Sequence, residues 1–420
     1  MTSINNLMKN LSLSYTPYHA VARAAAMLEE AGYVRLEEST AWELCRGGKY
    51  YVIRDGSALI AFHIGKEGGG FKIVASHTDS PCLKVKGNAA LMQNGYAKLN
   101  VERYGGGLNY SWLDIPLRLA GRIVTYDAQT GELVAKTVES DYTTVIPSVA
   151  IHFSREANSN LTLNPQVDLQ PILSLDPAFA LCEGDGAVER DLFVVNASEP
   201  YLAGAKEEFL VSPRIDNLVS AFASVEALAS AGDSGISVAC LMDNEEVGSR
   251  TKQGAGSDFL SATISRIAEA FGEKRELMLS QSFLVSCDGA HAIHPNHPEK
   301  SDAANPVRLG EGVVVKHHAN QNYTTDAFSS AFIKTIFGKA NVPFQDFYMR
   351  ADMPCGSTLG AISSSAVSVR SVDIGVAQLA MHSATETMAT ADYGHLVDAL
   401  AAFYATKCAF PSYDRSVIEG

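Results

Sequence analysis

The stretch GISVACLMDNEEVGS, residues 235–249, places two adjacent glutamates directly after an apolar run. The run has the length and the apolar content of a strand buried inside a sheet. A solvated loop explains one acid at such a point, whereas a pair suggests two roles. Because neighbouring residues on an extended chain point to opposite sides, we expect Glu245 and Glu246 to face different partners. One glutamate would then hold a metal ion while the other moves a proton.

Similar apolar runs alternate with helical patterns along the chain. The other runs are SALIAFHIG (57–65), FKIVASH (71–77), SFLVSCD (282–288) and SVRSVDIG (368–375). Helices are expected from Thr16-Pro17 to Gly32 and from Ser212-Pro213 to Gly232, and over 324–340 and 395–410. This alternation predicts an α/β fold, with a largely buried sheet covered by helices on both faces.

Residues 83–208 differ from the rest of the chain, with more turns and fewer helical patterns. The stretch GRIVTYDAQTGELVAKTV contains a hairpin-like TGEL turn. A chain of 420 residues is also too long for one ordinary core. We therefore predict an α/β domain formed by residues 1–82 and 209–420, interrupted by a mostly β domain over 83–208.

Composition narrows the class of protein. Hydrophobic residues make up 46% and charged residues 19%, as in ordinary globular proteins. The formal net charge of −14 argues against a nucleic-acid or anionic-membrane partner, since either needs a basic face. No apolar run approaches the roughly 18–20 residues that span a bilayer, and the first residues lack the layout of a signal peptide.

Cysteine spacing indicates the compartment. The 7 cysteines are scattered singly, without a CxxC pair. This pattern is typical of reduced thiols in the cytosol, so we expect a cytoplasmic protein without a cysteine-rich zinc site.

Histidine and acidic residues recur at or just after the ends of the apolar runs. They are His77 and Asp79, then Glu245 and Glu246, then Asp288, and finally His382, with Asp216 near a helix start. Each alone has a structural interpretation, as a satisfied histidine, a helix cap or a loop residue. Their recurrence favours a site instead, because sites in open α/β sheets form outside the carboxyl ends of strands.

The ligand types predict a metal centre. A set of His, Asp and Glu without thiolate suits zinc, manganese or cobalt. Five ligands are too many for one tetrahedral ion with an open position, but they suit two ions that share a bridging carboxylate. Glu246 would be a ligand and Glu245 the general base. Asp79, two residues after His77, would orient that imidazole.

Nine stretches resemble the M18 metallopeptidases, the aspartyl aminopeptidase family, in the family's order over most of the chain. They are ASHTDSPCLKVK, VERYGGGLNYSWLD, VIPSVAIHFSRE, PRIDNL, DNEEVGS, CDGAHAIHPN, VVVKHHANQNYTTD, DMPCGSTLG and VDIGVAQLAMHSATE. The resemblance implies a dinuclear zinc exopeptidase fold with an inserted dimerisation domain. It also implies an aminopeptidase that acts on peptides with a free N-terminus.

The resemblance implies two zinc ions per subunit, with cobalt or manganese as substitutes. The implied ligands are His77, Asp216 and Asp288 for one ion, and Asp216, Glu246 and His382 for the other.

For the chemistry itself, the resemblance implies that Glu245 is the base and that Asp79 orients His77. It further implies that the Asp216-Asn217 peptide bond is cis.

Four further residues match family positions that contact the substrate: His152, His291, Lys316 and Tyr323. His152 would be lent to the site of a neighbouring subunit, in a dodecamer built from dimers. Lys316 would meet an acidic N-terminal residue of the substrate. Its alternative interpretation is a lysine whose stem packs on apolar surface while its head reaches water.

Two positions depart from the family pattern. Ile115 stands where the family usually has arginine, and Ala384-Thr385 stand where it usually has Ile-Arg. Both bear on subunit contacts or pocket walls. The alternatives left open are a neutral, Leu-like preference, a two-metal deacylase or carboxypeptidase, and a non-catalytic scaffold.

Overall fold

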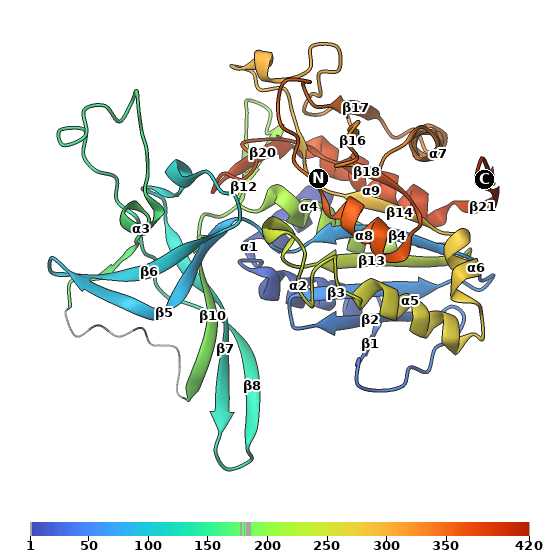
Figure 1. Ribbon diagram of the computed structural model, residues 1–420, viewed down its shortest axis with the longest axis horizontal. Coiled ribbons are helices and arrows are strands. Elements are labelled where there is room, and N and C mark those ends of the chain that lie inside the picture. Colours follow the sequence, from blue (N-terminus) through green and yellow to red (C-terminus); the bar gives the residue numbers. More distant parts are fainter. Residues whose placement is uncertain (1, 177–178, 180, 182–185, 420) are drawn as a thin grey trace.

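The computed structural model describes residues 2–176, 179, 181 and 186–419. Its largest sheet has nine strands in the order β1-β2-β3-β13-β4-β14-β18-β16-β17 (Figure 1). They are β1 (Val34–Leu36), β2 (Lys49–Arg54), β3 (Ala58–Ile64), β4 (Phe71–His77), β13 (Ile236–Met242), β14 (Phe283–Cys287), β16 (Val313–His317), β17 (Phe344–Tyr348) and β18 (Arg370–Gly375). β13, β4, β14 and β18 are parallel, whereas the β2–β3, β3–β13 and β16–β18 pairs are antiparallel, so the sheet is mixed.

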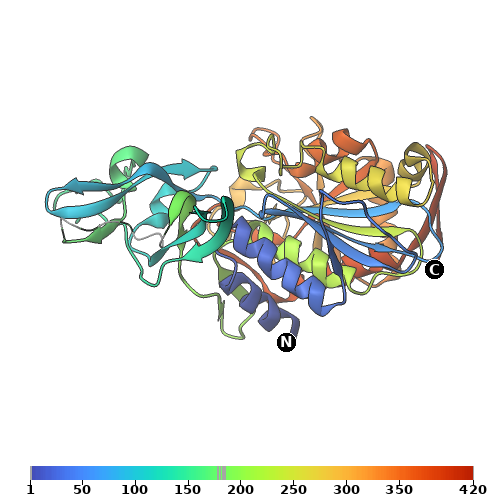
Figure 2. The ribbon, with the colours of Figure 1, turned by 90° about the horizontal axis from the view of Figure 1, so that it is seen from below.

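Helices cover both faces of this sheet, as the sequence predicts (Figure 2). One core contains side chains of α1 (Thr2–Ser12), α2 (Pro17–Glu30), α4 (Ile215–Leu228), α7 (Ala327–Lys339) and α9 (Thr390–Ala405). The other contains those of α5 (Phe259–Ala270), α6 (Arg275–Ser280) and α8 (Leu359–Val367). Strand residues alternate between the two cores: Leu59 and Ala61 face the first, and Ile60 and Phe62 the second. Both faces being apolar explains the continuous apolar runs of the sequence.

A second, antiparallel sheet extends to one side of these layers (Figures 1 and 2). Its order is β8-β7-β10-β5-β6-β9, and it has its own apolar core. The strands are β5 (Cys82–Gln93), β6 (Tyr96–Tyr104), β7 (Leu117–Asp127), β8 (Glu132–Glu139), β9 (Ile172–Ser174) and β10 (Ala187–Asn196). β7 and β8 form the expected hairpin around the TGEL turn. The domain boundaries at 83 and 208 stay a prediction.

Smaller elements complete the described chain. A five-stranded sheet has the order β11 (Tyr201–Ala203), β12 (Phe209–Ser212), β20 (Glu386–Ala389), β19 (Ala377–Leu379) and β15 (Ala290–His291). The short helices are η1 (Asn109–Trp112), α3 (Pro165–Asp168), η2 (Glu245–Val247) and η3 (Pro298–Lys300). A hairpin of β21 (Lys407–Ser412) and β22 (Arg415–Glu419) ends the chain.

The helix predictions are correct in place but not at every boundary. α2 begins at Pro17 after Thr16, as expected. The predicted helix over 395–410 is wrong at both ends, because α9 starts at Thr390 and stops at Ala405. Residues from Lys407 pair with β22 instead, and Phe410 stacks on the buried ring of Phe283. Tertiary packing therefore overrides local helical propensity there.

The cysteines described by the structure, which are Cys45, Cys82, Cys240, Cys287, Cys355 and Cys408, are free thiols, and Cys182 lies outside the described residues. Within the described ranges, no helix is long and apolar enough to cross a membrane.

Candidate metal centre

The predicted ligands gather at one edge of the nine-stranded sheet. His77 is the last residue of β4, and Asp288 directly follows β14. The two glutamates stand in η2, shortly after β13, and His382 follows β19, the strand next after β18 in the chain. Since these neighbouring strands are parallel, their carboxyl ends meet, which brings the residues together.

Asp216 reaches the same place from the start of α4. The backbone of Asp216 and Asn217 is not helical, and the peptide bond between them is cis, as the family resemblance implied. The Asn217 side chain donates to the backbone oxygen of Cys287, at 2.9 Å, and so ties this turn to the end of β14. The Asp216 amide donates to the Glu386 carboxylate at 2.9 Å.

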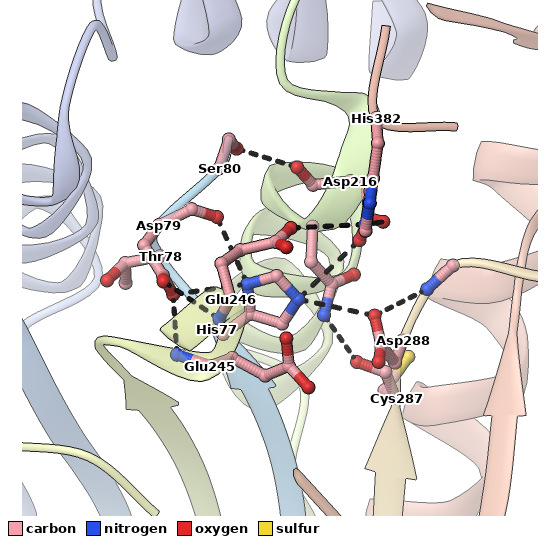
Figure 3. Close-up of polar contacts among 12 residues, drawn as sticks. His77, Thr78, Asp79, Ser80, Asp216, Glu245, Glu246, Cys287, Asp288 and His382 are labelled. Atoms are coloured by element: carbon pink, nitrogen blue, oxygen red, sulfur yellow. Dashed lines mark hydrogen bonds and ion pairs between the residues drawn. The ribbon is translucent and has the colours of Figure 1, made fainter. Parts of the chain in front are cut away.

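The two oxygens of Asp216 face different histidines (Figure 3). Oδ1 lies 3.5 Å from His77 Nε2, which is also 3.3 Å from Asp288 Oδ1. Oδ2 lies 3.4 Å from His382 Nε2, which is also 3.4 Å from Glu246 Oε1. The side chains thus form two groups that share Asp216, and the potential ligand atoms within each group lie within 4.8 Å of one another.

These residues fit bound cations. Asp216 Oδ1 and Glu246 Oε1 are buried without a hydrogen-bond partner in the described chain. Leaving buried carboxylate oxygens unpaired costs free energy unless a charge is present to balance them. The donor set of imidazole and carboxylate suits zinc, and the shared carboxylate suits a pair of ions.

The electrostatics of the side chains agree with this fit. Burial alone would lower the pKa of His77, but its contacts with the carboxylates of Asp216, Asp288 and Asp79 raise it well above its usual value. Burial, together with the charge of Asp216, raises the pKa of Glu246 well above its usual value. Crowded carboxylates therefore draw positive charge to this place, which a metal ion supplies.

Asp79 is fully buried and organises one side of the centre. Its Oδ1 lies 3.3 Å from His77 Nδ1 and accepts the backbone N–H of Glu245 at 3.1 Å. Its Oδ2 accepts the backbone N–H of Glu246 at 3.1 Å. The position beside the outer imidazole nitrogen is that of an orienting carboxylate.

The glutamate pair lies in a short helical turn and not on an extended chain, so the geometric reason predicted for its two directions is wrong. The turn is fixed because both amides donate to the single carboxylate of Asp79. Glu246 reaches toward His382, whereas Glu245 is partly exposed beside His77. Burial, with the nearby charges of Asp288 and Asp79, raises the pKa of Glu245 to about 7.

The predicted substrate residues are only partly brought together. Lys316 is 1% exposed, donates to the backbone oxygens of Asp288 (3.2 Å) and Gly289 (3.1 Å), and has its ammonium 5.0 Å from the ring centre of Tyr323. The alternative in which the head of Lys316 reaches water is therefore wrong. His291 is exposed and lines a cavity of about 330 Å³ nearby.

His152 lies apart, on an exposed turn of the segment that connects β8 with β9. In the part of the chain that the structure describes, no hydrogen bond or ion pair links it to the other predicted residues. Within the described chain, His152 therefore does not contact the metal centre of its own subunit.

Three residues at the centre carried no sequence signal of their own. Glu386 accepts the amides of Asp216 (2.9 Å) and His382 (2.8 Å), and Tyr104 donates to Asp79 Oδ2 at 2.7 Å. The buried Gln378 amide lines the cavity beside His291, with its Nε2 lacking a partner within the described chain. All three stand in stretches that carry the family resemblance, but only tertiary contacts reveal what they touch.

The two departures from the family pattern both involve the core of the six-stranded sheet. The Ala384 backbone N–H donates to Ser111 Oγ at 2.9 Å, and the Ala384 backbone oxygen accepts the side-chain N–H of Asn196 at 2.7 Å. Ile115 packs against the core of the six-stranded sheet, as Ala384 does.

Comparisons with known proteins agree on one family. The family model "Aminopeptidase I zinc metalloprotease (M18)" matches residues 10–181 and 178–404. The chain is 40% identical over 422 residues to "Probable M18 family aminopeptidase 2" of Pseudomonas aeruginosa (strain UCBPP-PA14), covering 96% of this chain and 97% of that protein.

Solved structures agree on the fold. Ape4, in its cryo-EM complex with Nbr1, aligns with a TM-score of 0.92 at 34% identity, covering 96% of this chain and 85% of that one. The S. cerevesiae mApe1 dodecamer aligns with a TM-score of 0.81 at 25% identity, covering 96% of both chains.

Proposed function

The chain belongs to the M18 family of zinc metallo-aminopeptidases, and from this premise we propose that it is a dinuclear enzyme that removes acidic residues, Asp or Glu, from peptide N-termini. The observation that carries the dinuclear part is Asp216, whose two oxygens face the imidazoles of two different ligand groups. A carboxylate in that position suits a bridge between two ions.

His77, Asp216 and Asp288 would hold one zinc, and Asp216, Glu246 and His382 the other. When bound, zinc would supply the positive charge that polarises a scissile carbonyl and lowers the pKa of water. Cobalt and manganese accept the same ligands.

Glu245 is the general base of the proposal. It stands beside the ligands without belonging to either group that shares Asp216, and its carboxylate is partly exposed to an incoming substrate. It takes a proton from the attacking water and returns it to the leaving amine. Asp79 would position the base, because it accepts the Glu245 amide, and would orient the ligand His77, because it faces the imidazole.

Lys316 is the residue proposed to select an acidic substrate. An ammonium has three donors, and backbone oxygens accept two hydrogen bonds from Lys316. One donor is left for a substrate carboxylate, with Tyr323 and His291 completing the pocket and His152 arriving from a neighbouring subunit.

We also propose a homo-oligomer in which residues 83–208 build the dimer, and dimers build a dodecamer. The likeness to the mApe1 dodecamer supports this, as does the exposed edge strand β8. The free thiols support a reducing compartment, the cytoplasm.

The function is tested with Glu245→Gln and Glu246→Gln. Glu245→Gln should keep both metal ions and lower turnover of an Asp anilide by several orders of magnitude, beyond the roughly 10²–10⁴-fold of general base catalysis alone. Glu246→Gln should instead lower the metal content. Metal analysis and turnover are measured on the same samples. Activity of Glu245→Gln within tenfold of the parent, or full metal content in Glu246→Gln, would refute the assignment.

A further inference from the structure

We propose that Tyr104 is a positioning residue of the metal centre, supplied by the six-stranded sheet. Its hydroxyl fixes the Asp79 carboxylate and the turn that carries the two glutamates. The inference rests on the proposed function for its catalytic consequence, but its effect on metal retention can be measured without any substrate.

The hydroxyl of Tyr104 joins two parts of the centre. It donates to Asp79 Oδ2 at 2.7 Å and accepts the side-chain N–H of Asn244 at 2.8 Å. Asn244 has a left-handed backbone (φ 60°) and directly precedes Glu245, so it sets the direction in which the turn leaves β13. The Tyr104 hydroxyl thus holds both the Asp79 carboxylate and Asn244, the residue that directly precedes η2.

Tyr104 completes the set of donors around Asp79. Oδ1 of Asp79 faces His77 Nδ1 and the Glu245 amide, and Oδ2 faces the Glu246 amide and Tyr104. A buried carboxylate with a donor on every side is held in one orientation. Without the hydroxyl, Oδ2 keeps only the Glu246 amide, and Asn244 loses its acceptor.

The position of the hydroxyl is set by the six-stranded sheet. Tyr104 is the last residue of β6, and its ring packs edge-on against Phe193 of β10, at 5.7 Å between ring centres. Its ring also lines a cavity of about 290 Å³ at the junction with the nine-stranded sheet. Any shift of β6 therefore moves the hydroxyl relative to Asp79.

The chain that follows Tyr104 continues across the centre. Gly105 has a positive φ of 73°, which favours glycine, and a Cβ there would lie only 3.1 Å from Cβ of Glu246. The Leu108 amide donates to the backbone oxygen of His382 at 2.9 Å. The segment from Tyr104 to Leu108 thus contacts Glu246 and His382, two of the three residues in the group Asp216, Glu246 and His382.

The test is Tyr104→Phe, which removes the hydroxyl and keeps the ring against Phe193. We expect zinc retention against a competing chelator to fall about 10–100-fold, the usual effect of losing an outer partner of a ligand. With the zinc sites saturated, kcat for an Asp anilide should fall by a similar factor, while KM stays within twofold.

Tyr33→Phe is the matched control. Tyr33 is also buried, and its hydroxyl donates to the backbone oxygen of Leu228 at 3.1 Å, away from the centre. Both variants lose one buried hydrogen bond, but Tyr33→Phe should keep the zinc retention and kcat of the parent. If Tyr104→Phe and Tyr33→Phe retain zinc equally well, the proposal is overturned, whatever the melting temperatures of the two variants.

A double-mutant cycle tests whether Tyr104 acts through Asp79. In an Asp79→Asn chain, adding Tyr104→Phe should lower zinc retention by less than twofold further, because the partner is already altered. Fully additive losses would show that the hydroxyl acts elsewhere and would overturn the role assigned here. If zinc retention responds as expected but no aminoacyl anilide is cleaved, the proposed function fails and the positioning role stands.

Discussion

Lys316 and Lys72 are both buried ammonium groups that donate to backbone oxygens, yet they have different surroundings. Lys316 donates to the oxygens of Asp288 and Gly289 at the metal centre. Lys72 lies under the C-terminal segment and donates to the oxygens of Tyr404 and Thr406. Burying a charge without a carboxylate partner is costly, so each lysine requires a physical reason.

Lys316→Met tests the proposed acidic preference. A partly desolvated ammonium–carboxylate contact is worth about 1.5–3 kcal/mol, or roughly ten- to a hundredfold in kcat/KM. The parent should therefore cleave Asp and Glu anilides that much better than Leu anilide, and Lys316→Met should lose the difference. Lys72→Met is the matched control, since it removes a buried ammonium away from the substrate and should keep the ratio. Equal rates on Asp and Leu in the parent, or an unchanged ratio in Lys316→Met, would contradict the assignment.

Because Lys72 is buried, the free energy of unfolding should rise as the pH is raised from 7 to 10. Burial lowers its pKa from 10.5 to about 8 in the folded chain. Between these values the unfolded chain holds a proton that the folded chain has released, so stability rises with pH and the cost of burial returns as pH falls through 8. Going from pH 7 to pH 10, the parent should gain about 2–3 kcal/mol of unfolding free energy relative to Lys72→Met. Urea unfolding of both chains at each pH measures this, and equal changes in the two chains would rule it out.

At the scale of elements, the turn η2 explains why two adjacent glutamates can differ in role. Their amides converge on Asp79, so the turn is held from outside and not by its own short length. The side chains then diverge, with Glu246 next to His382 and Glu245 left partly exposed beside His77. The different directions of the two glutamate side chains therefore depend both on the turn η2 and on Asp79, which holds it.

The start of α7 offers a prediction on stability. Asp326 accepts the Ser329 amide at 2.7 Å, and the Ser329 hydroxyl accepts the Asp326 amide at 3.0 Å, which is a capping box. Asp326→Ala should lower the free energy of unfolding by about 1 kcal/mol, whereas Asp326→Ser should keep most of it, because serine also caps. Urea denaturation of the three chains provides the comparison. No difference between Ala and Ser at this position would show that the cap contributes nothing.

At the scale of the whole molecule, the six-stranded sheet has an exposed side. β8 is an edge strand, and Leu133 on it is 66% exposed. Phe153 and Leu175, in the same inserted region, are 87% and 75% exposed. An exposed edge strand and exposed apolar side chains favour contact with another chain.

Light scattering should therefore give a mass that is a multiple of the 44.9 kDa chain. If subunits share sites as proposed, neither His152→Phe nor Glu245→Gln should be active alone, but co-assembled chains should regain activity. In mixed assemblies, some centres with an intact Glu245 receive His152 from the other chain. A single-chain mass at working concentration, or no gain on mixing after subunit exchange, would speak against the shared site.

The amino-acid sequence by itself was sufficient for the central strands β3, β4, β13, β14 and β18, for the helices α2, α4, α7 and α9, and for the ligand types at the strand ends. These features are local, because apolar periodicity predicts each strand and parallel strands deliver their carboxyl ends to one edge. The predicted boundaries of α9 were wrong, and its end was decided by the packing of Phe410 on Phe283. Spacing and ligand types suggested the roles of Glu245, Glu246 and Asp79, whereas the division of the ligands between two ions and the substrate residues came from the family resemblance.

Only the tertiary structure decided how the side chains are held. Tyr104 and Asn244 are 140 residues apart, and Asp216 and Glu386 are 170 apart, yet each pair is joined by one hydrogen bond. Such contacts depend on how whole sheets pack, and a single tyrosine or glutamate leaves no periodic pattern to predict them. The burial of Lys316 was decided in the same way, because its strand is covered on both sides only after the chain has folded.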